Sequence, residues 1–167
     1  IMAQALQGLR YQYFQLQSVK TGKKVDLSRA TTSIEYFEDM LVPSISMKIE
    51  VVSTINIVSE LMITGGEMVA IEAETGSGTF QFGELDGNGD IVAGKNELYV
   101  YKVSAMDSQR QASRFTMHLV SAEYFINETS RCNFKFKSQT IDKHVKQILG
   151  PHVMNVDPDR IGTIEET

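Results

Sequence analysis

Alternation of apolar and polar residues is the strongest pattern in this chain. Residues 45–52, ISMKIEVV, place Ile45, Met47, Ile49 and Val51 on one side and polar residues on the other. Successive side chains of a strand point to opposite faces, so this period of two predicts a half-buried β-strand. Five further segments rich in Tyr, Phe, Val and Ile carry similar patterns: 10–19, 68–75, 97–104, 113–121 and 132–137.

Turn-forming residues separate these strands. TGKK follows the first strand, TGG occupies 64–66, and MDSQRQAS covers 106–113. A glycine-rich segment, 76–96, is expected to form a long loop between two strands, because Gly, Asn and Asp tolerate the dihedrals of turns. Six or more strands with short connections predict a mainly β fold with minor α content. The expected architecture is an antiparallel β-barrel or sandwich with one or two flanking helices.

The segment SQTIDKHVKQILGP, residues 138–151, predicts a helix. Thr140 is the expected N-cap, and Gly150 followed by proline ends the segment. Asp142 and Lys146 are spaced for an i,i+4 ion pair. The apolar residues fall on one stripe of the helix: Ile141, Val145, Ile148 and Leu149.

A second, shorter helix is predicted over residues 122–131, AEYFINETSR, where Phe125 and Ile126 are available to face the sheet. The chain is therefore expected to divide into a β domain over 1–139 and a C-terminal piece over 140–167. That piece would contain the amphipathic helix and the start of a following segment. The sequence opens on Ile-Met and stops on IGTIEET, which suggests that it was cut from a longer protein.

Composition narrows the functional classes. The 167 residues are 42% hydrophobic and 22% charged, which is typical of a folded globular protein. A net charge of -5 argues against a domain that grips a phosphate backbone, because such binding needs clustered Lys and Arg. The single cysteine, Cys132, excludes an internal disulfide and a Cys-based zinc cluster. No apolar run has the roughly 18 residues that a membrane span needs.

The stretch ELDGNGDIVAGKNE, residues 84–97, matches part of an EF-hand calcium loop. Asp86, Asn88, Asp90 and Glu97 occupy the first, third, fifth and twelfth positions of the motif. The sixth position, which needs glycine, is Ile91, and the flanking segments predict strands instead of helices. An ordinary loop is therefore the favoured interpretation, and a calcium site of another kind at Asp86, Asn88 and Asp90 is the alternative.

Catalytic patterns are absent from the sequence. His118, His144 and His152 have no carboxylate or histidine at metal-ligand spacing, and no nucleophile elbow or phosphate loop is present. Adjacent carboxylates Glu38 and Asp39 lie in an extended segment, where they point to opposite sides. We expect them to be solvated or to pair at an interface. The prediction is a protein without catalytic residues, cofactor or metal.

Three stretches, in order, resemble a known family. They are IEYFEDMLVPSISMKIEVV, ELMITGGEMVAIEAET and the segment from Asn96 to Gly150. The most specific parts are LMITGGE at 61–67 and LYVYKVS followed by TMHLVSAEYFINETSR. Over residues 30–150 the chain is similar to the tube-type domain of the baseplate hub proteins of contractile-tailed bacteriophages.

The resemblance implies a structural role in the virion. Hub proteins of this family form a homotrimeric ring in which each chain carries two tube-type β-barrels, so six similar surfaces join a sixfold tail tube to a threefold spike. The implied partners are the tail tube protein, the central spike protein and the tape-measure protein. DNA would pass through the lumen without specific binding, no membrane insertion is implied, and assembly would take place in the host cytoplasm. Only one such domain is visible in this sequence.

Acidic residues on the predicted strands suggest a channel wall. Glu50, Glu72 and Glu74 lie on polar strand faces and could line a lumen that repels DNA, although ordinary solvent-facing positions are the simpler interpretation. Two alternatives within the same class are a tail-tube subunit and a spike-hub subunit of a type VI secretion system. An alternative from another class is a calcium- or carbohydrate-binding β-sandwich that uses the 76–96 loop.

Overall fold

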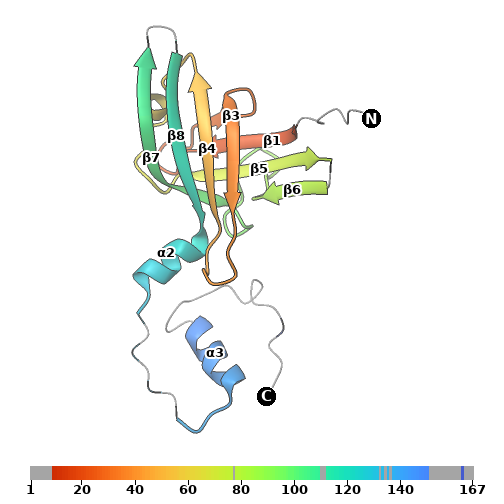
Figure 1. Cartoon of the computed structure of the whole chain (residues 1–167), viewed down its shortest axis with the longest axis vertical. Helices are drawn as coiled ribbons and strands as arrows, with labels where there is room; N and C mark the ends of the chain where they lie inside the picture. The colour runs from red at the N-terminus through yellow and green to blue at the C-terminus, as the bar shows by residue number, and fades with distance from the viewer. Residues whose placement is uncertain are drawn as a thin grey trace, which may run out of the picture. The chain divides into compact units, whose positions relative to one another are not determined.

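The computed structural model describes residues 9–76, 78–109, 112–131, 133, 135, 137–150 and 163. The chain divides into two compact units, residues 1–122 and 123–167, which are described separately. The expected boundary between residues 139 and 140 stays a prediction. The strands described in the first unit are β1 Arg10–Gln17, β2 Lys24–Asp26, β3 Thr31–Phe37, β4 Ser46–Ser53, β5 Met68–Thr75, β6 Gly78–Phe82, β7 Leu98–Gln109 and β8 Ala112–Ser121 (Figure 1).

All the described strand pairs are antiparallel. The strands follow the order β2-β1-β5-β7-β8-β4-β3. Off this path, β6 pairs with Ile71–Thr75 of β5, beyond the two residues of β5 that pair with β7. The joint between β5 and β7 is short, with the register Met68↔Tyr99 and Val69↔Leu98. The sheet turns a corner at this joint, so that β1, β5 and β6 run across β3, β4, β7 and β8 (Figure 1).

The hydrophobic core lies between the two layers made by this corner. Alternation supplies one apolar face from each strand, as the sequence pattern predicts. The first layer contributes Phe14, Leu16, Val69 and Ile71 to the core. The second layer contributes Met47, Ile49, Val51, Phe115, Met117 and Leu119, and connecting segments add Leu27, Ile57 and Leu61.

Aromatic rings bring the edges of the sheet together. Tyr36 of β3 contacts Phe80 of β6 in an edge-to-face arrangement, with ring centroids 5.5 Å apart, and its centroid lies 5.8 Å from that of Phe82. The hydrogen-bonded sheet itself ends at β2 and β3 and is not closed. The mainly β, antiparallel prediction is therefore confirmed, and a continuous hydrogen-bonded barrel is not what the described strands form.

Three parts of the sequence interpretation need correction or addition. The expected long loop over 76–96 contains β6, because Thr79, Phe80 and Phe82 favour a strand in spite of the flanking glycines. The expected turn over 106–113 is narrower, since β7 continues to Gln109 and β8 begins at Ala112. The sequence interpretation also missed β2, β3 and the short helix α1 Ile57–Glu60, whose N-cap Asn56 accepts a hydrogen bond from the Ser59 amide.

The expected strand over 132–137 is wrong for the residues that the structure describes. Asn133, Lys135 and Lys137 lie outside any strand. The other three positions of this segment, Cys132, Phe134 and Phe136, fall outside the described residues.

The second unit contains two helices close to their expected positions. These are α2 Ala122–Thr129 and α3 Ile141–Leu149. Thr140 occupies the N-cap position of α3, as predicted, but its side chain makes no capping hydrogen bond. Lys146 Nζ lies 3.8 Å from Asp142 Oδ2 in the predicted i,i+4 pair. Gly150 ends α3 in an extended conformation instead of the left-handed one that such a glycine often adopts.

We predict that Gly83→Ala destabilises the first unit. Gly83 has φ +73°, and a Cβ at this position would lie 2.9 Å from the Ala70 Cβ. Backbone strain and overpacking therefore both contribute to the destabilisation. The expected loss in free energy of unfolding is about 2 to 4 kcal/mol. Urea unfolding followed by circular dichroism measures it.

The matched control is Gly87→Ala, because a Cβ at Gly87 meets nothing within 4 Å and its φ is not in the left-handed region. This control should stay within about 0.5 kcal/mol of the native protein. Equal stability of the two variants would contradict the assigned packing of Gly83 on β5.

Candidate functional site

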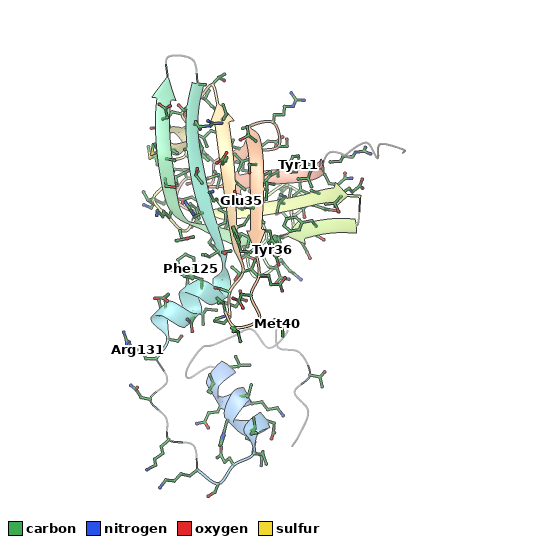
Figure 2. All side chains as sticks on the ribbon, in the orientation of Figure 1. Tyr11, Glu35, Tyr36, Met40, Phe125 and Arg131 are labelled. Carbon is green, nitrogen blue, oxygen red and sulfur yellow. The ribbon has the colours of Figure 1, made fainter. Side chains whose placement is uncertain are left out.

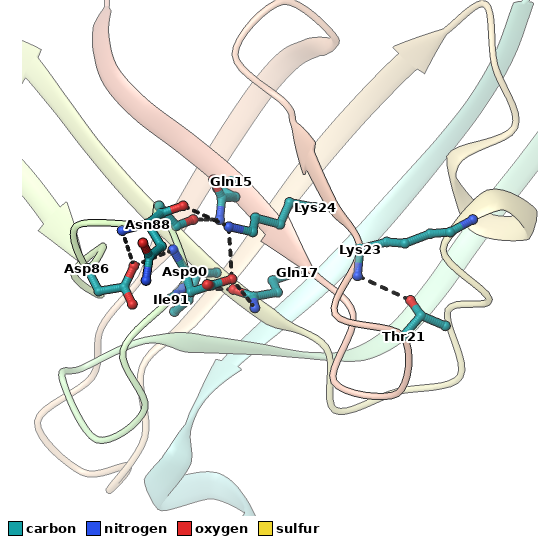
Figure 3. Close-up of polar contacts among 10 residues, drawn as sticks. Gln15, Gln17, Thr21, Lys23, Lys24, Asp86, Asn88, Asp90 and Ile91 are labelled. Carbon is teal, nitrogen blue, oxygen red and sulfur yellow. Dashed lines mark hydrogen bonds and ion pairs between the residues drawn. The ribbon is translucent and has the colours of Figure 1, made fainter.

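The loop with partial EF-hand spacing folds around its own first aspartate (Figure 3). The Asp86 Oδ1 accepts hydrogen bonds from the backbone amides of Asn88 and Asp90, both at 2.8 Å. These amides hold the pKa of Asp86 below its ordinary value. The Gly89 amide also donates to the Asp86 carbonyl at 2.9 Å. Asp86 therefore stabilises a tight turn by bonding to the backbone that follows it.

Side chains from the neighbouring strands hold this loop in place. Lys24 Nζ lies 2.9 Å from Asp90 Oδ1, and Gln17 Nε2 donates to the same oxygen at 3.0 Å. Gln17 Oε1 accepts from the Ile91 amide at 2.7 Å, and Gln15 donates to the Gly89 carbonyl at 2.7 Å (Figure 3). Gln17 is buried and uses both ends of its amide here. The loop is thus docked on β1 and β2.

Glu97, the twelfth position of the calcium motif, serves a different turn. Its two carboxylate oxygens accept the amides of Gly94 and Lys95, each at 2.8 Å, and the Tyr99 hydroxyl also donates to it. Burial alone would raise the pKa of Glu97, but these hydrogen bonds together outweigh it and lower the pKa. Among the described residues, no group of three His, Cys, Asp or Glu side chains is placed to hold a metal ion.

Glu67 repeats the arrangement of Glu97 at the start of β5. It is buried, and its carboxylate oxygens accept the amides of Thr64 at 2.7 Å and Gly65 at 3.0 Å. In both turns the carboxylate bonds the amides three and two residues before it. The TGGE part of LMITGGE therefore forms a braced turn that leads into a core strand.

His118 lies on the outer face of β8, opposite the core residues Phe115 and Met117, as the alternation predicts. Its Nε2 is 2.8 Å from the Ser104 hydroxyl. Partial burial, together with its cross-strand neighbours Lys102 and Lys48, lowers the pKa of His118. Of the other two histidines, His144 belongs to α3, and His152 falls outside the described residues.

The proposed channel acids occupy two different surfaces. Glu50 lies on β4, where its cross-strand neighbours are Ser33 and Thr116. Glu72 and Glu74 share β5, and Glu74 accepts a hydrogen bond from Gln12 at 2.9 Å.

These three glutamates alternate with buried core residues, so each points away from the core. The core lies between the layer that carries β4 and the layer that carries β5. The outer face that carries Glu50 is therefore opposite the outer face that carries Glu72 and Glu74. A single copy can turn only one of these two faces toward a channel.

The connection between β3 and β4 carries the most exposed apolar residues of the described chain. Met40 and Leu41 are 100% and 91% exposed, and Phe37 and Val42 are about half exposed. Figure 2 shows Met40 at the tip of this hairpin, away from the core. We call residues 37–42 the apolar hairpin loop. The sequence signal is the run FEDMLV, in which the apolar residues stand on both sides of two carboxylates and do not follow the period of a strand.

Hydrogen bonds within the apolar hairpin loop fix its shape. Asp39 Oδ1 accepts the Leu41 amide at 2.9 Å, and the Asp39 carbonyl accepts the Val42 amide at 3.1 Å. The Tyr36 hydroxyl donates to Glu38 at 2.8 Å, and partial burial with this carboxylate raises the pKa of Tyr36 to about 12. The loop is therefore a defined protrusion with an apolar tip and an acidic rim.

Comparisons with known proteins show little similarity at the sequence level. No protein-family model matches the chain, and no curated protein matches it. Among solved structures, the chain is similar to the tail protein from Neisseria meningitidis MC58, with 13% identity and a TM-score of 0.49. The match covers 85% of this chain and 34% of that one, so the chain spans about a third of the length of that protein. None of the helices described is long and apolar enough to cross a membrane.

We predict that Glu97→Gln destabilises the protein at neutral pH but not at low pH. The amide would direct an N–H group at backbone N–H groups, which costs about 1 to 3 kcal/mol of unfolding free energy. Because the folded pKa of Glu97 lies below its ordinary value of 4.5, the stabilisation is fully present above that value. It is lost as the pH falls through the folded pKa.

Urea unfolding of Glu97→Gln and of the native protein from pH 7 to pH 3 measures this difference. The control is Glu84→Gln, because Glu84 is exposed and the substitution leaves in place its backbone carbonyl, which accepts the Val92 amide. A deficit for Glu97→Gln that stays constant down to pH 3 would contradict the role given to the ionised carboxylate.

Proposed function

We propose that this chain is a structural component of a phage tail baseplate hub. In this role it forms a ring that joins the tail tube to the central spike and surrounds the DNA channel, and it catalyses no reaction. The proposed assembly is a homotrimer in the virion, made in the host cytoplasm, that contacts the tube, spike and tape-measure proteins.

The observation that carries the proposal is the apolar hairpin loop. Exposed large apolar side chains are common singly, but four of them within the six residues of a fixed protrusion, two almost fully exposed, are typical of a contact surface. Each such side chain contributes about 1.5 to 3 kcal/mol when a partner buries it completely. A protein whose task is assembly has a use for this surface, and a protein that works alone does not.

The order of segments supports the same class of function. The stretch that resembles the hub family most specifically, LMITGGE, forms the braced turn before β5. The acidic outer faces with Glu50 or with Glu72 and Glu74 suit a channel that DNA crosses without binding. A tail-tube subunit or a type VI spike-hub subunit is the second candidate, because the same protruding loop would serve either ring.

We predict that the purified chain forms a ring of three copies. Sedimentation velocity over a range of concentrations should give the mass of a trimer, and electron micrographs should show threefold symmetry. Six copies would favour the tube subunit over the hub. A monomer at every concentration tested would contradict the structural assignment altogether.

We predict that charge reversal slows DNA ejection when it is made on one of the two outer faces and has no effect when it is made on the other. In phage that carry the variant, Glu50→Lys and the pair Glu72→Lys/Glu74→Lys serve as controls for each other, because they lie on opposite layers. The set that faces the lumen should slow ejection through attraction to phosphate, with tail assembly unchanged. Ejection at the native rate in both variants would reject a role for these acids in the channel.

A further inference from the structure

The two ends of the β3–β4 hairpin differ in charge. At one end is the apolar hairpin loop, with Glu38 and Asp39 beside its apolar tip. The other end brings together three connections: the β1–β2 turn, the β2–β3 turn and the segment around α1. The Ala30 carbonyl accepts the Val52 amide, and Lys23 Nζ lies 3.1 Å from Glu60 of α1, which ties these connections to one another.

Exposed residues at this second end are apolar and basic. The apolar side chains, each more than half exposed, are Val19, Ile55 and Met62. The basic side chains at this end are Lys20, Lys23 and Arg29. They stand against two acids: Glu60, which pairs with Lys23, and Asp26 at the start of the β2–β3 turn, whose carboxylate accepts the Ser28 amide. We call this set the basic end. An apolar surface with a basic rim is the complement of an apolar tip with an acidic rim.

The two surfaces cannot meet within one copy. They lie at opposite ends of β3 and β4, which are seven and eight residues long (Figure 1). At about 3.4 Å per residue, the strands hold them about 25 Å apart. The core between the layers fixes this separation, because β4 contributes Met47, Ile49 and Val51 to it.

We propose that the apolar hairpin loop docks on the basic end of a second copy of this chain. This proposal rests on the assembly role given above and specifies the surfaces that build it. The contact places Met40 and Leu41 against Val19, Ile55 and Met62, with Glu38 and Asp39 facing the basic side chains. Such a contact is heterologous, since each copy offers a different surface to each neighbour.

When two copies are joined by one heterologous contact, one apolar hairpin loop and one basic end remain free. Copies therefore add head to tail until the chain of contacts closes into a ring or continues as a stack. The Asp39 turn keeps the loop in shape before contact, so little ordering entropy opposes docking.

The test uses the full chain and sedimentation to measure the concentration at half-assembly. Met40→Ser/Leu41→Ser should raise this concentration about tenfold or more, because two buried anchors are lost. Ile55→Ser/Met62→Ser should do the same from the other side. Both pairs are exposed, so thermal melting of the isolated copy should not change.

A mixing experiment separates this contact from a symmetric one. The loop variant keeps its basic end, and the basic-end variant keeps its loop, so equal amounts of the two should form one dimer that grows no further. If the loop instead contacted another loop, the mixture would contain no such dimer, and the proposal would be overturned.

Charge reversal tests the rim. Glu38→Lys should weaken assembly, and combination in turn with Lys20→Glu, Lys23→Glu or Arg29→Glu should restore it in at least one case. Glu84→Lys and Lys95→Glu make the same charge changes in the loop between β6 and β7 and should have no effect. Restoration by none of the three would count against the proposed pairing.

The outcomes also separate this proposal from the assigned function. If the native chain assembles but neither surface affects its assembly, only this contact is wrong. If the native chain is a monomer at every concentration tested, both the docking of a second copy and the proposed function are overturned.

Discussion

The fold depends on the corner at which β5 meets β7. Only two residue pairs, Met68↔Tyr99 and Val69↔Leu98, join the layers there in strand register, and the Gly66 and Val100 amides extend the joint by one hydrogen bond each. Glu67 and Glu97 stand directly before the two strands and fix the turns that lead into them. Because the core lies between the two layers, the direction of each layer at this corner determines whether their apolar faces meet.

Much of the sheet could be predicted from the sequence. Period-two alternation identified β1, β4, β5, β7 and β8, because these strands have one face in the core and the other outside it. Capping signals located α3, since Thr140 and Gly150 bound its apolar stripe. β6 was missed because Gly78 and Gly83 make its flanks resemble a loop, while its phenylalanines pack on a strand distant in sequence.

The candidate sites show what spacing alone cannot decide. Asp86, Asn88 and Asp90 fit both a calcium loop and an aspartate-stabilised turn, because the two structures use the same residue types at the same intervals. The difference lies in where the carboxylates point, and that is set by Lys24 and Gln17 on neighbouring strands. The apolar hairpin loop was missed for a related reason, since exposure of Met40 and Leu41 follows from the turn around Asp39 and leaves no periodic pattern.

The contact of Tyr36 with Phe80 and Phe82 has a mechanical consequence. Backbone hydrogen bonds fix two strands in one register, whereas aromatic faces and edges keep attracting one another over a range of offsets. The boundary between β3 and β6 can therefore slide by a small distance under load without rupture of directional bonds.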